Sequence, residues 1–177
     1  MAGVEPPIAA DETAAVLGAL DRMRALIAWK CGGLDAAGMS ATLGASTMTL
    51  AGLLKHLALV EDSHFAKLLF NQQPGAPWDA VDWDATPDWE WESAADDSPE
   101  ELMTLWMQAV ERSTAVVAAA LTAGGLDHVG KYVSRNGESP NLRRMLLDLI
   151  EEYARHLGHA DLIRESVDGL TGEDPPR

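Results

Sequence analysis

The sequence predicts an all-α fold, a four-helix bundle in which a long crossover connects the second helix to the third. Four stretches of about 20 to 28 residues carry apolar side chains three or four positions apart, as a half-buried helix does. Residues that typically start and stop helices flank these stretches. No stretch alternates apolar and polar residues as a strand does, so we expect no sheet.

The first two helices are predicted at residues 11–32 and 47–70. Asp11 can cap the start of the first helix, and the pair Gly32-Gly33 ends it. The second helix ends at the turn-forming residues that follow Phe70. The residues expected to face the core are Val16, Leu20, Met23, Ile27 and Cys31 in the first helix and Leu50, Leu53, Leu57, Val60 and Leu68 in the second.

The third helix is predicted from residue 98 to about residue 123, and the fourth from Ser139-Pro140 to about Val167. Ser98 and Glu101 have the spacing of a capping box, in which each side chain accepts a hydrogen bond from the backbone of the other residue. Pro99 suits the first helical position, where no backbone N–H is needed. Glycines follow both predicted helix ends. These stop signals are Gly124-Gly125 and Asp168-Gly169.

The crossover between the second and third helices is rich in tryptophan. Residues 78–92 interleave four of the six tryptophans with six carboxylates. Disordered linkers are poor in large aromatic residues. We therefore expect an ordered crossover whose tryptophans pack over the bundle and whose carboxylates face water. A crossover of this length is also a candidate lid over a site, and Trp83 or Trp89 could line its mouth.

Composition places the chain among ordinary globular proteins. Its 177 residues are 47% apolar and 23% charged, which fits one domain spanning residues 1–177, with about 1–10 and 171–177 flexible. A net charge of −15 argues against binding nucleic acid or an anionic membrane through a basic surface. The amino terminus lacks the pattern of a signal peptide and no segment is apolar for long enough to span a membrane, so we expect a cytoplasmic protein.

Three residues that could bind a metal lie close together near the end of the fourth helix. At about 100° per residue, Glu152 and His156 are roughly 40° apart around the helix, and His159 falls beside Glu152. Their stripe overlaps the apolar face of the same helix. A carboxylate and an imidazole on a buried face are costly unless something pairs them, and a divalent cation could do so.

A further ligand would have to come from another helix. His56 is the better candidate because it lies within the apolar face of the second helix. His64 lies two turns further on in a more polar run, and we interpret it and His128 as surface or rim residues. The alternative is a hydrogen-bonded pair in the core without any metal, in which Glu152 contacts His56 or His156. Spacing alone leaves the two interpretations equally open.

Three segments resemble the DinB-like four-helix bundle superfamily, and within it the DUF664 branch, related to the metal-binding domain of mycothiol-dependent maleylpyruvate isomerase. They are residues 50–61, the tryptophan-rich crossover, and residues 150–165 with the following Asp168-Gly169. The resemblance extends from about residue 13 to 169. It implies one metal ligand on the second helix and a pair four residues apart on the last. Here these ligands are His56, Glu152 and His156.

The resemblance also implies a chemistry. Relatives often activate a low-molecular-weight thiol such as mycothiol, bacillithiol or glutathione at the metal. Two histidines and a glutamate that leave one position open are typical of a catalytic zinc site, although nickel, manganese or iron also suit these ligands. We therefore expect a metal-dependent transferase or isomerase acting on a small molecule with a mycothiol-like thiol. The chain does not resemble the separate C-terminal domain of the isomerase, so we do not expect that particular reaction.

Two other functions stay open from the sequence. The protein could be a non-catalytic module that binds a metal or small ligand, or a dimerising scaffold; the resemblance also implies a homodimer. His159 could orient a ligand, act as a general base, or fill the open end of the bundle. Asp148 could support a ligand or be a solvated carboxylate. Cys31 is the only cysteine and lies on an apolar face, which predicts a buried, unreactive thiol.

Overall fold

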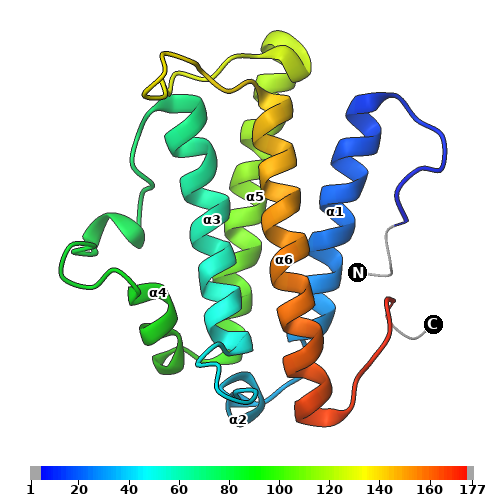
Figure 1. Ribbon diagram of the computed structural model, residues 1–177, viewed down its shortest axis with the longest axis vertical. Coiled ribbons are helices and arrows are strands. Elements are labelled where there is room, and N and C mark those ends of the chain that lie inside the picture. Colours follow the sequence, from blue (N-terminus) through cyan, green and yellow to red (C-terminus); the bar gives the residue numbers. More distant parts are fainter. Residues whose placement is uncertain (1–4, 175–177) are drawn as a thin grey trace.

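The computed structural model describes residues 5–174, and within them the chain forms α-helices and short 3-10 turns but no sheet (Figure 1). The all-α prediction is therefore confirmed for this part of the chain. The α-helices are α1 (Glu12–Cys31), α2 (Ala36–Met39), α3 (Leu50–Phe70), α4 (Trp89–Glu92), α5 (Pro99–Gly124) and α6 (Leu142–Asp168). The 3-10 turns are η1 (Trp78–Ala80), η2 (Ser93–Asp96) and η3 (Gly125–Asp127).

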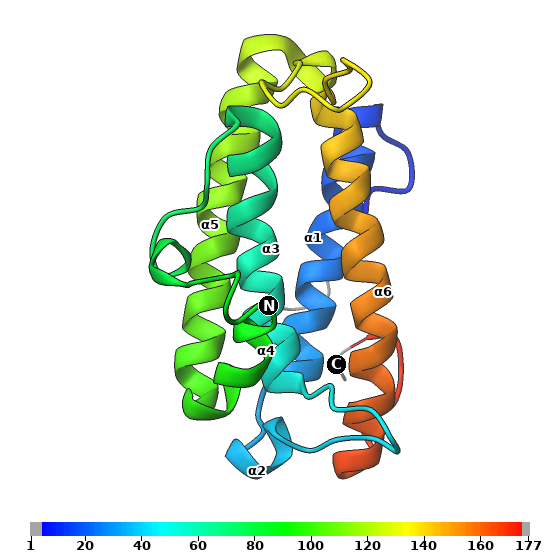
Figure 2. The same cartoon turned by 60° about the vertical axis from the view of Figure 1, so that its left-hand side comes forward.

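The four long helices lie side by side, as the predicted bundle requires. Helix α3 packs against α5 and α6, and α1 packs against α6. Figures 1 and 2 show that α3 and α5 run in the same direction and that α1 and α6 run in the opposite one. Because α3 and α5 are parallel, the chain must return along the length of the bundle between them. The segment with η1, α4 and η2 makes this return.

Helix starts agree with the capping signals in two of the four long helices and differ in the others. Asp11 caps α1, and Ser98 and Glu101 form the predicted capping box at α5. Helix α3 begins after Thr49, three residues later than predicted. The predicted start of α6 at Ser139-Pro140 is also wrong, because Asn141 accepts a hydrogen bond from the backbone of the first helical turn and the helix starts at Leu142. Asparagine is among the strongest N-cap residues.

The core lies along α3 and the inner faces of its neighbours. Leu53, Leu54 and Leu57 of α3 are fully buried, as are Leu149 and Tyr153 of α6. These side chains supply the apolar burial that stabilises helices of this length against unfolding. In the described part of the chain, no helix combines the length and apolar character needed to cross a lipid bilayer.

A buried polar network crosses the centre of the bundle and ties its four long helices together. The carboxylate of Glu61 on α3 accepts hydrogen bonds from Arg24 of α1 at 2.7 and 2.8 Å and from the hydroxyl of Tyr153 on α6 at 2.6 Å. Two α5 side chains complete it, since Ser113 donates to Glu61 and Trp106 donates to the Tyr153 oxygen. Burial beside the Glu61 charge raises the pKa of Tyr153 well above its ordinary value. The network therefore fixes α6 relative to α3 at the residue next to Glu152.

The crossover is ordered and packed on α3, as its tryptophans predicted. Trp78 is buried and donates from its indole nitrogen to Asp62 of α3 at 2.8 Å. The rings of Trp78 and Trp83 both meet that of Trp89 edge to face. The prediction that the carboxylates of this segment face water is wrong at Glu90, which is buried against the bundle. Its contacts make it part of the candidate site.

The two ends of the described chain meet on α1. Arg22 forms ion pairs with Glu5 and with Asp174. Residues 1–4 and 175–177 lie outside the described residues. The predicted flexibility of both ends, and the interpretation of residues 1–177 as one domain, stay predictions.

Candidate metal centre

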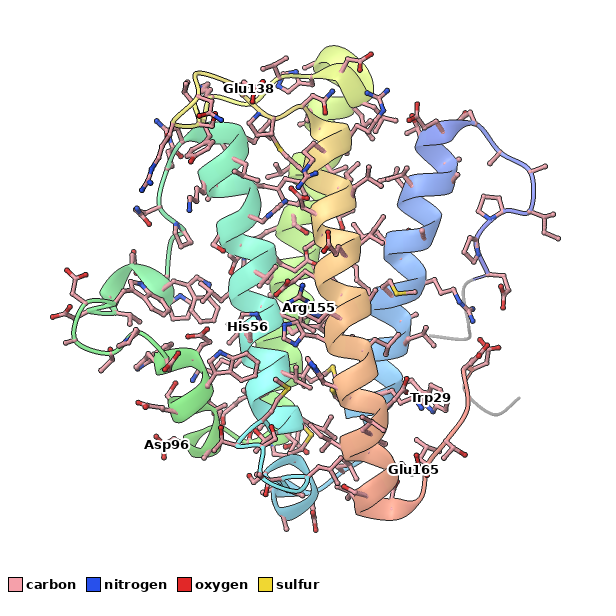
Figure 3. The ribbon with its side chains drawn as sticks, viewed as in Figure 1. Trp29, His56, Asp96, Glu138, Arg155 and Glu165 are labelled. Atoms are coloured by element: carbon pink, nitrogen blue, oxygen red, sulfur yellow. The ribbon has the colours of Figure 1, made fainter. Side chains whose placement is uncertain are left out.

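The three predicted ligands come together between α3 and α6. His56 extends from α3, and Glu152 and His156 lie one turn apart on α6. The Nε2 atoms of both histidines are 3.1 Å from the same oxygen, Oε1 of Glu152. One nitrogen or oxygen from each residue lies within 4.8 Å of the others. Figure 3 shows His56 at mid-height of the bundle, close to the segment of α6 that carries Arg155.

The cluster is buried on its histidine side and open on its carboxylate side. The exposed fraction of the side chain is 8% for His156 and 19% for His56, but 34% for Glu152. Beside Glu152 lies a surface groove of about 400 Å³ between α3 and α6, whose polar lining includes Ser63, Lys67 and Asp148. The groove therefore brings solvent up to Glu152, the most exposed member of the cluster.

Glu90 is a site residue that the sequence did not indicate. It lies on α4 in the crossover, and its Oε1 is 3.1 Å from Nδ1 of His56, on the other side of the ring from Glu152. No spacing signal could have identified it, because Glu90 is separated from His56 by 34 positions and approaches it only after the crossover has folded onto α3. The Trp89-Glu90-Trp91 sequence was interpreted as tryptophans packed inward and carboxylates facing water.

Trp91 covers one face of His56. Their ring centroids are 4.6 Å apart and their planes are 24° from parallel. The indole reaches this position because residue 52 on α3 is glycine: a Cβ atom there would lie 2.8 Å from Cε3 of Trp91. Lys55 holds the neighbouring part of the crossover, since its ammonium lies 4.4 Å from the centre of the Trp89 ring and pairs with Asp97. The crossover is thus docked directly on the helix that carries His56.

His159 contacts the outer side of His156 and not the converging ligand atoms. Its Nδ1 is 3.4 Å from Nδ1 of His156, and the two rings meet edge to face. Both histidines of the cluster therefore have their second ring nitrogen next to a polar partner. For His56 this partner is Glu90, and for His156 it is His159.

Burial and the neighbouring charges shift the pKa values of all three groups. Burial lowers the pKa of His56, but the hydrogen bonds and charges of Glu90 and Glu152 outweigh it and the pKa is raised overall. Burial and the neighbouring His56 lower the pKa of His156. Burial raises the pKa of Glu152, but the histidine contacts outweigh it and the pKa is lowered. Glu152 is therefore ionised and His156 neutral near pH 7, the states in which these side chains bind metals.

The arrangement fits a divalent cation. Two imidazole nitrogens and one carboxylate oxygen converge from two helices on a partly buried point with one open side. Such a donor set is typical of catalytic zinc sites, and it also suits nickel, manganese and iron. The sequence also left open a metal-free alternative, in which Glu152 forms a hydrogen-bonded pair with a histidine. That alternative involves the same contacts between Glu152 and the two histidines. Metal ligation by these residues is taken up below as a proposal.

Other residues singled out in the sequence lie outside the cluster. His64 is half-buried rather than at the surface, with its Nε2 2.8 Å from the backbone oxygen of Met145. Asp148 pairs with Arg144 one turn earlier on α6, as a solvated carboxylate would. Burial raises the pKa of the Cys31 thiol to about 12, which agrees with the predicted unreactive cysteine.

Fold and site together define an all-α protein with a candidate metal centre of two histidines and one glutamate between the antiparallel helices α3 and α6. A family model described as mycothiol-S-transferase matches residues 15–169. The chain therefore belongs to the mycothiol-S-transferase family, part of the DinB/YfiT-like metal-binding helical superfamily. The predicted superfamily is thus confirmed, whereas the DUF664 branch stays a prediction. No curated protein matches the sequence significantly.

Proposed function

We propose that this protein is a metal- and mycothiol-dependent transferase that joins the thiol to an electrophilic small molecule. The observation that carries the proposal is the convergence of His56, Glu152 and His156 on one point that is open to solvent. The family points to the thiol and to the type of transfer. Because the family description specifies transfer, we favour it over isomerisation and over a function in binding or scaffolding alone.

The three residues would hold the metal, and the rest of the site would shape its surroundings. A divalent ion, with zinc the first choice and nickel, manganese or iron the alternatives, supplies positive charge that keeps a bound thiol ionised at neutral pH. Glu152 offers an ionised oxygen shared by both histidines. Trp91 covers His56 and excludes water from that face of the imidazole. Glu90 and His159 meet the ring nitrogens that face away from Glu152.

The groove beside Glu152 is the proposed entrance for both substrates. Ser63 and Tyr132 offer hydroxyl groups along it, and Lys67 offers an ammonium. In the transfer, a bond forms between the thiol sulfur and an electrophilic carbon, the thiol proton passes to water, and the leaving group departs with its bonding electrons. His159 lies beyond His156 from the converging atoms. We therefore propose that it orients His156 and does not exchange protons with a substrate.

Metal content tests the proposal first. Protein purified without chelators would be analysed by inductively coupled plasma mass spectrometry, together with His56→Ala and Glu152→Gln. Glu151→Gln is the matched control, because Glu151 is the exposed neighbour of Glu152. We expect near-stoichiometric metal in the parent and the control and its loss in the other two variants. Absence of metal from the parent, even after reconstitution with zinc, nickel and manganese, would contradict the proposal.

Turnover is the second test. The metal-loaded protein would be incubated with mycothiol and a panel of electrophiles, and the conjugate would be followed by mass spectrometry. We expect conjugate formation that depends on the metal and disappears in Glu152→Gln. Metal binding without conjugate formation would favour the binding module that the sequence left open. The expected homodimer stays a prediction, and sedimentation of the same samples measures it.

A further inference from the structure

We propose that Glu90 of the crossover is a positioning residue that holds His56 with its Nε2 atom toward the metal position. This inference rests on the proposed metal centre and adds a requirement to it. Glu90 does not reach the converging atoms itself. It acts through the opposite side of the imidazole ring, where its Oε1 lies 3.1 Å from Nδ1 of His56.

The geometry of the ring specifies what Glu90 does. Neutral imidazole carries one proton, and only the nitrogen without it can bind a metal. A carboxylate oxygen next to Nδ1 favours the proton at that atom, because an ionised carboxylate can only accept a hydrogen bond. Nε2 faces Oε1 of Glu152 at the same distance of 3.1 Å, so the lone pair is free at Nε2 only when a cation takes the place of the proton there. Glu90 therefore holds the remaining proton at Nδ1 when a metal is bound at Nε2, and it fixes the orientation of the ring.

The burial of Glu90 has no explanation in packing alone. Its side chain is only 8% exposed, and among residues 5–174 its second oxygen, Oε2, has no hydrogen-bond partner. A buried carboxylate that contacts a single side chain costs stability. An apolar residue at this position of α4 would fill the same space without that cost. The contact with His56 is the compensating interaction, which indicates a role in the site.

The crossover holds Glu90 in place from both sides along the chain. The next residue, Trp91, is stacked on His56 and lies against Gly52. The preceding residue, Trp89, lies under the ammonium group of Lys55. Because both neighbours are anchored on α3, the backbone of Glu90 is held beside His56 as long as α4 stays docked. The crossover thus connects α3 to α5 and also covers one side of the candidate metal centre.

The affinity for zinc tests the inference on the full-length protein. Dissociation constants would be measured by competition with a chromophoric chelator for the parent, Glu90→Ala and Glu90→Gln. Glu92→Ala is the matched control, because it removes the same charge from the exposed face of the same short helix. We expect binding about 10- to 100-fold weaker in Glu90→Ala. Glu90→Gln, whose amide oxygen can still accept the Nδ1 proton, should lose less, and Glu92→Ala should stay close to the parent.

Two further measurements separate positioning from a structural role. The visible absorption spectrum of the cobalt-substituted protein reports the geometry of the ligands, and thermal unfolding of the metal-free protein reports stability. Positioning predicts an altered cobalt spectrum in Glu90→Ala and its recovery in Glu90→Gln. Parental zinc affinity and spectrum in Glu90→Ala would overturn this inference but leave the proposed function intact. A parent protein that binds no zinc, nickel or manganese would overturn both.

Discussion

His56 and His156 contribute the same atom to the candidate metal centre, but their surroundings differ. The second nitrogen of His56 meets a buried carboxylate 34 positions away in the chain, and its ring is covered by Trp91. The second nitrogen of His156 meets a neighbouring imidazole three positions along the same helix. The pKa of His56 is raised and that of His156 is lowered. One half of the site therefore depends on tertiary docking, and the other follows from the periodicity of a single helix.

Disruption of the buried polar network around Glu61, which lies beneath both the His56 half and the His156 half of the site, should reduce stability the most. Glu61→Ala leaves the guanidinium of Arg24 buried without its carboxylate and frees the Tyr153 hydroxyl next to Glu152. We expect the free energy of unfolding to fall by about 3 to 5 kcal/mol, measured by urea titration of the metal-free protein. Arg144→Ala is the control, because it removes an ion pair with Asp148 whose arginine side chain is 68% exposed and should cost under about 1 kcal/mol. Equal losses in the two variants would contradict the prediction.

A methyl group at Gly52 should disturb the His56 half alone. In Gly52→Ala the added carbon would lie 2.8 Å from the Trp91 ring, so Trp91 must move and Glu90 with it. We expect a loss of about 1 to 3 kcal/mol in stability together with weaker zinc binding.

Gly158→Ala on α6 is the matched control for the His156 half. Nothing lies within 4 Å of the added carbon, and alanine favours helix more than glycine does. This variant should gain about 0.5 to 1 kcal/mol and keep parental zinc affinity. If both alanine variants bound zinc equally well, the proposed dependence on the docked crossover would be wrong.

Removal of the His159 side chain, the partner of His156, should weaken zinc binding less than removal of the Glu90 side chain, the partner of His56. His159→Ala removes an imidazole 3.4 Å from His156, whereas Glu90→Ala removes a carboxylate. We expect zinc binding at most about tenfold weaker in His159→Ala, by the same chelator competition. His128→Ala, outside the cluster, serves as the control. A larger loss of zinc affinity in His159→Ala than in Glu90→Ala would contradict this prediction.

His64 gives a reference for a half-buried histidine without a carboxylate contact. Burial lowers its pKa below 6.5, partly offset by the hydrogen bond with Met145. Below that pH the unfolded chain binds a proton at His64 that the folded protein does not, so this residue lowers stability as the pH falls. Between pH 7.5 and 5, the free energy of unfolding of His64→Gln should therefore fall less than that of the parent. The difference between the two proteins should be only a part of the fall in the parent. Urea unfolding at both pH values measures it, and parallel curves would contradict it.

The same contrast explains which site residues the sequence could predict. Glu152 and His156 follow from helical spacing on an apolar stripe, and His56 follows from the leucines around it. Glu90 and Gly52 matter only because the crossover folds back on α3, and no local pattern encodes that contact.

The helix boundaries, too, could be predicted only where the signal is local in the sequence. The capping box at Ser98 and Glu101 was read correctly, because both partners lie within one turn. At α6 the sequence predicted a start at Ser139-Pro140, but the cap is Asn141, next to the connection from η3. Backbone hydrogen bonds from Gly130 to Pro140 and from Leu142 to His128 hold this connection against the residues before the helix. Asn141, and not Ser139, is thereby left to cap α6.

The placement of Cys31 has a consequence for an enzyme that handles electrophiles. Reagents that a transferase passes to an external sulfhydryl also alkylate the cysteines of proteins. Cys31 is 3% exposed and burial raises its pKa to about 12, so its thiol stays protonated near pH 7. Under the proposed function, the buried thiol of Cys31 would therefore be shielded from alkylation by the electrophile.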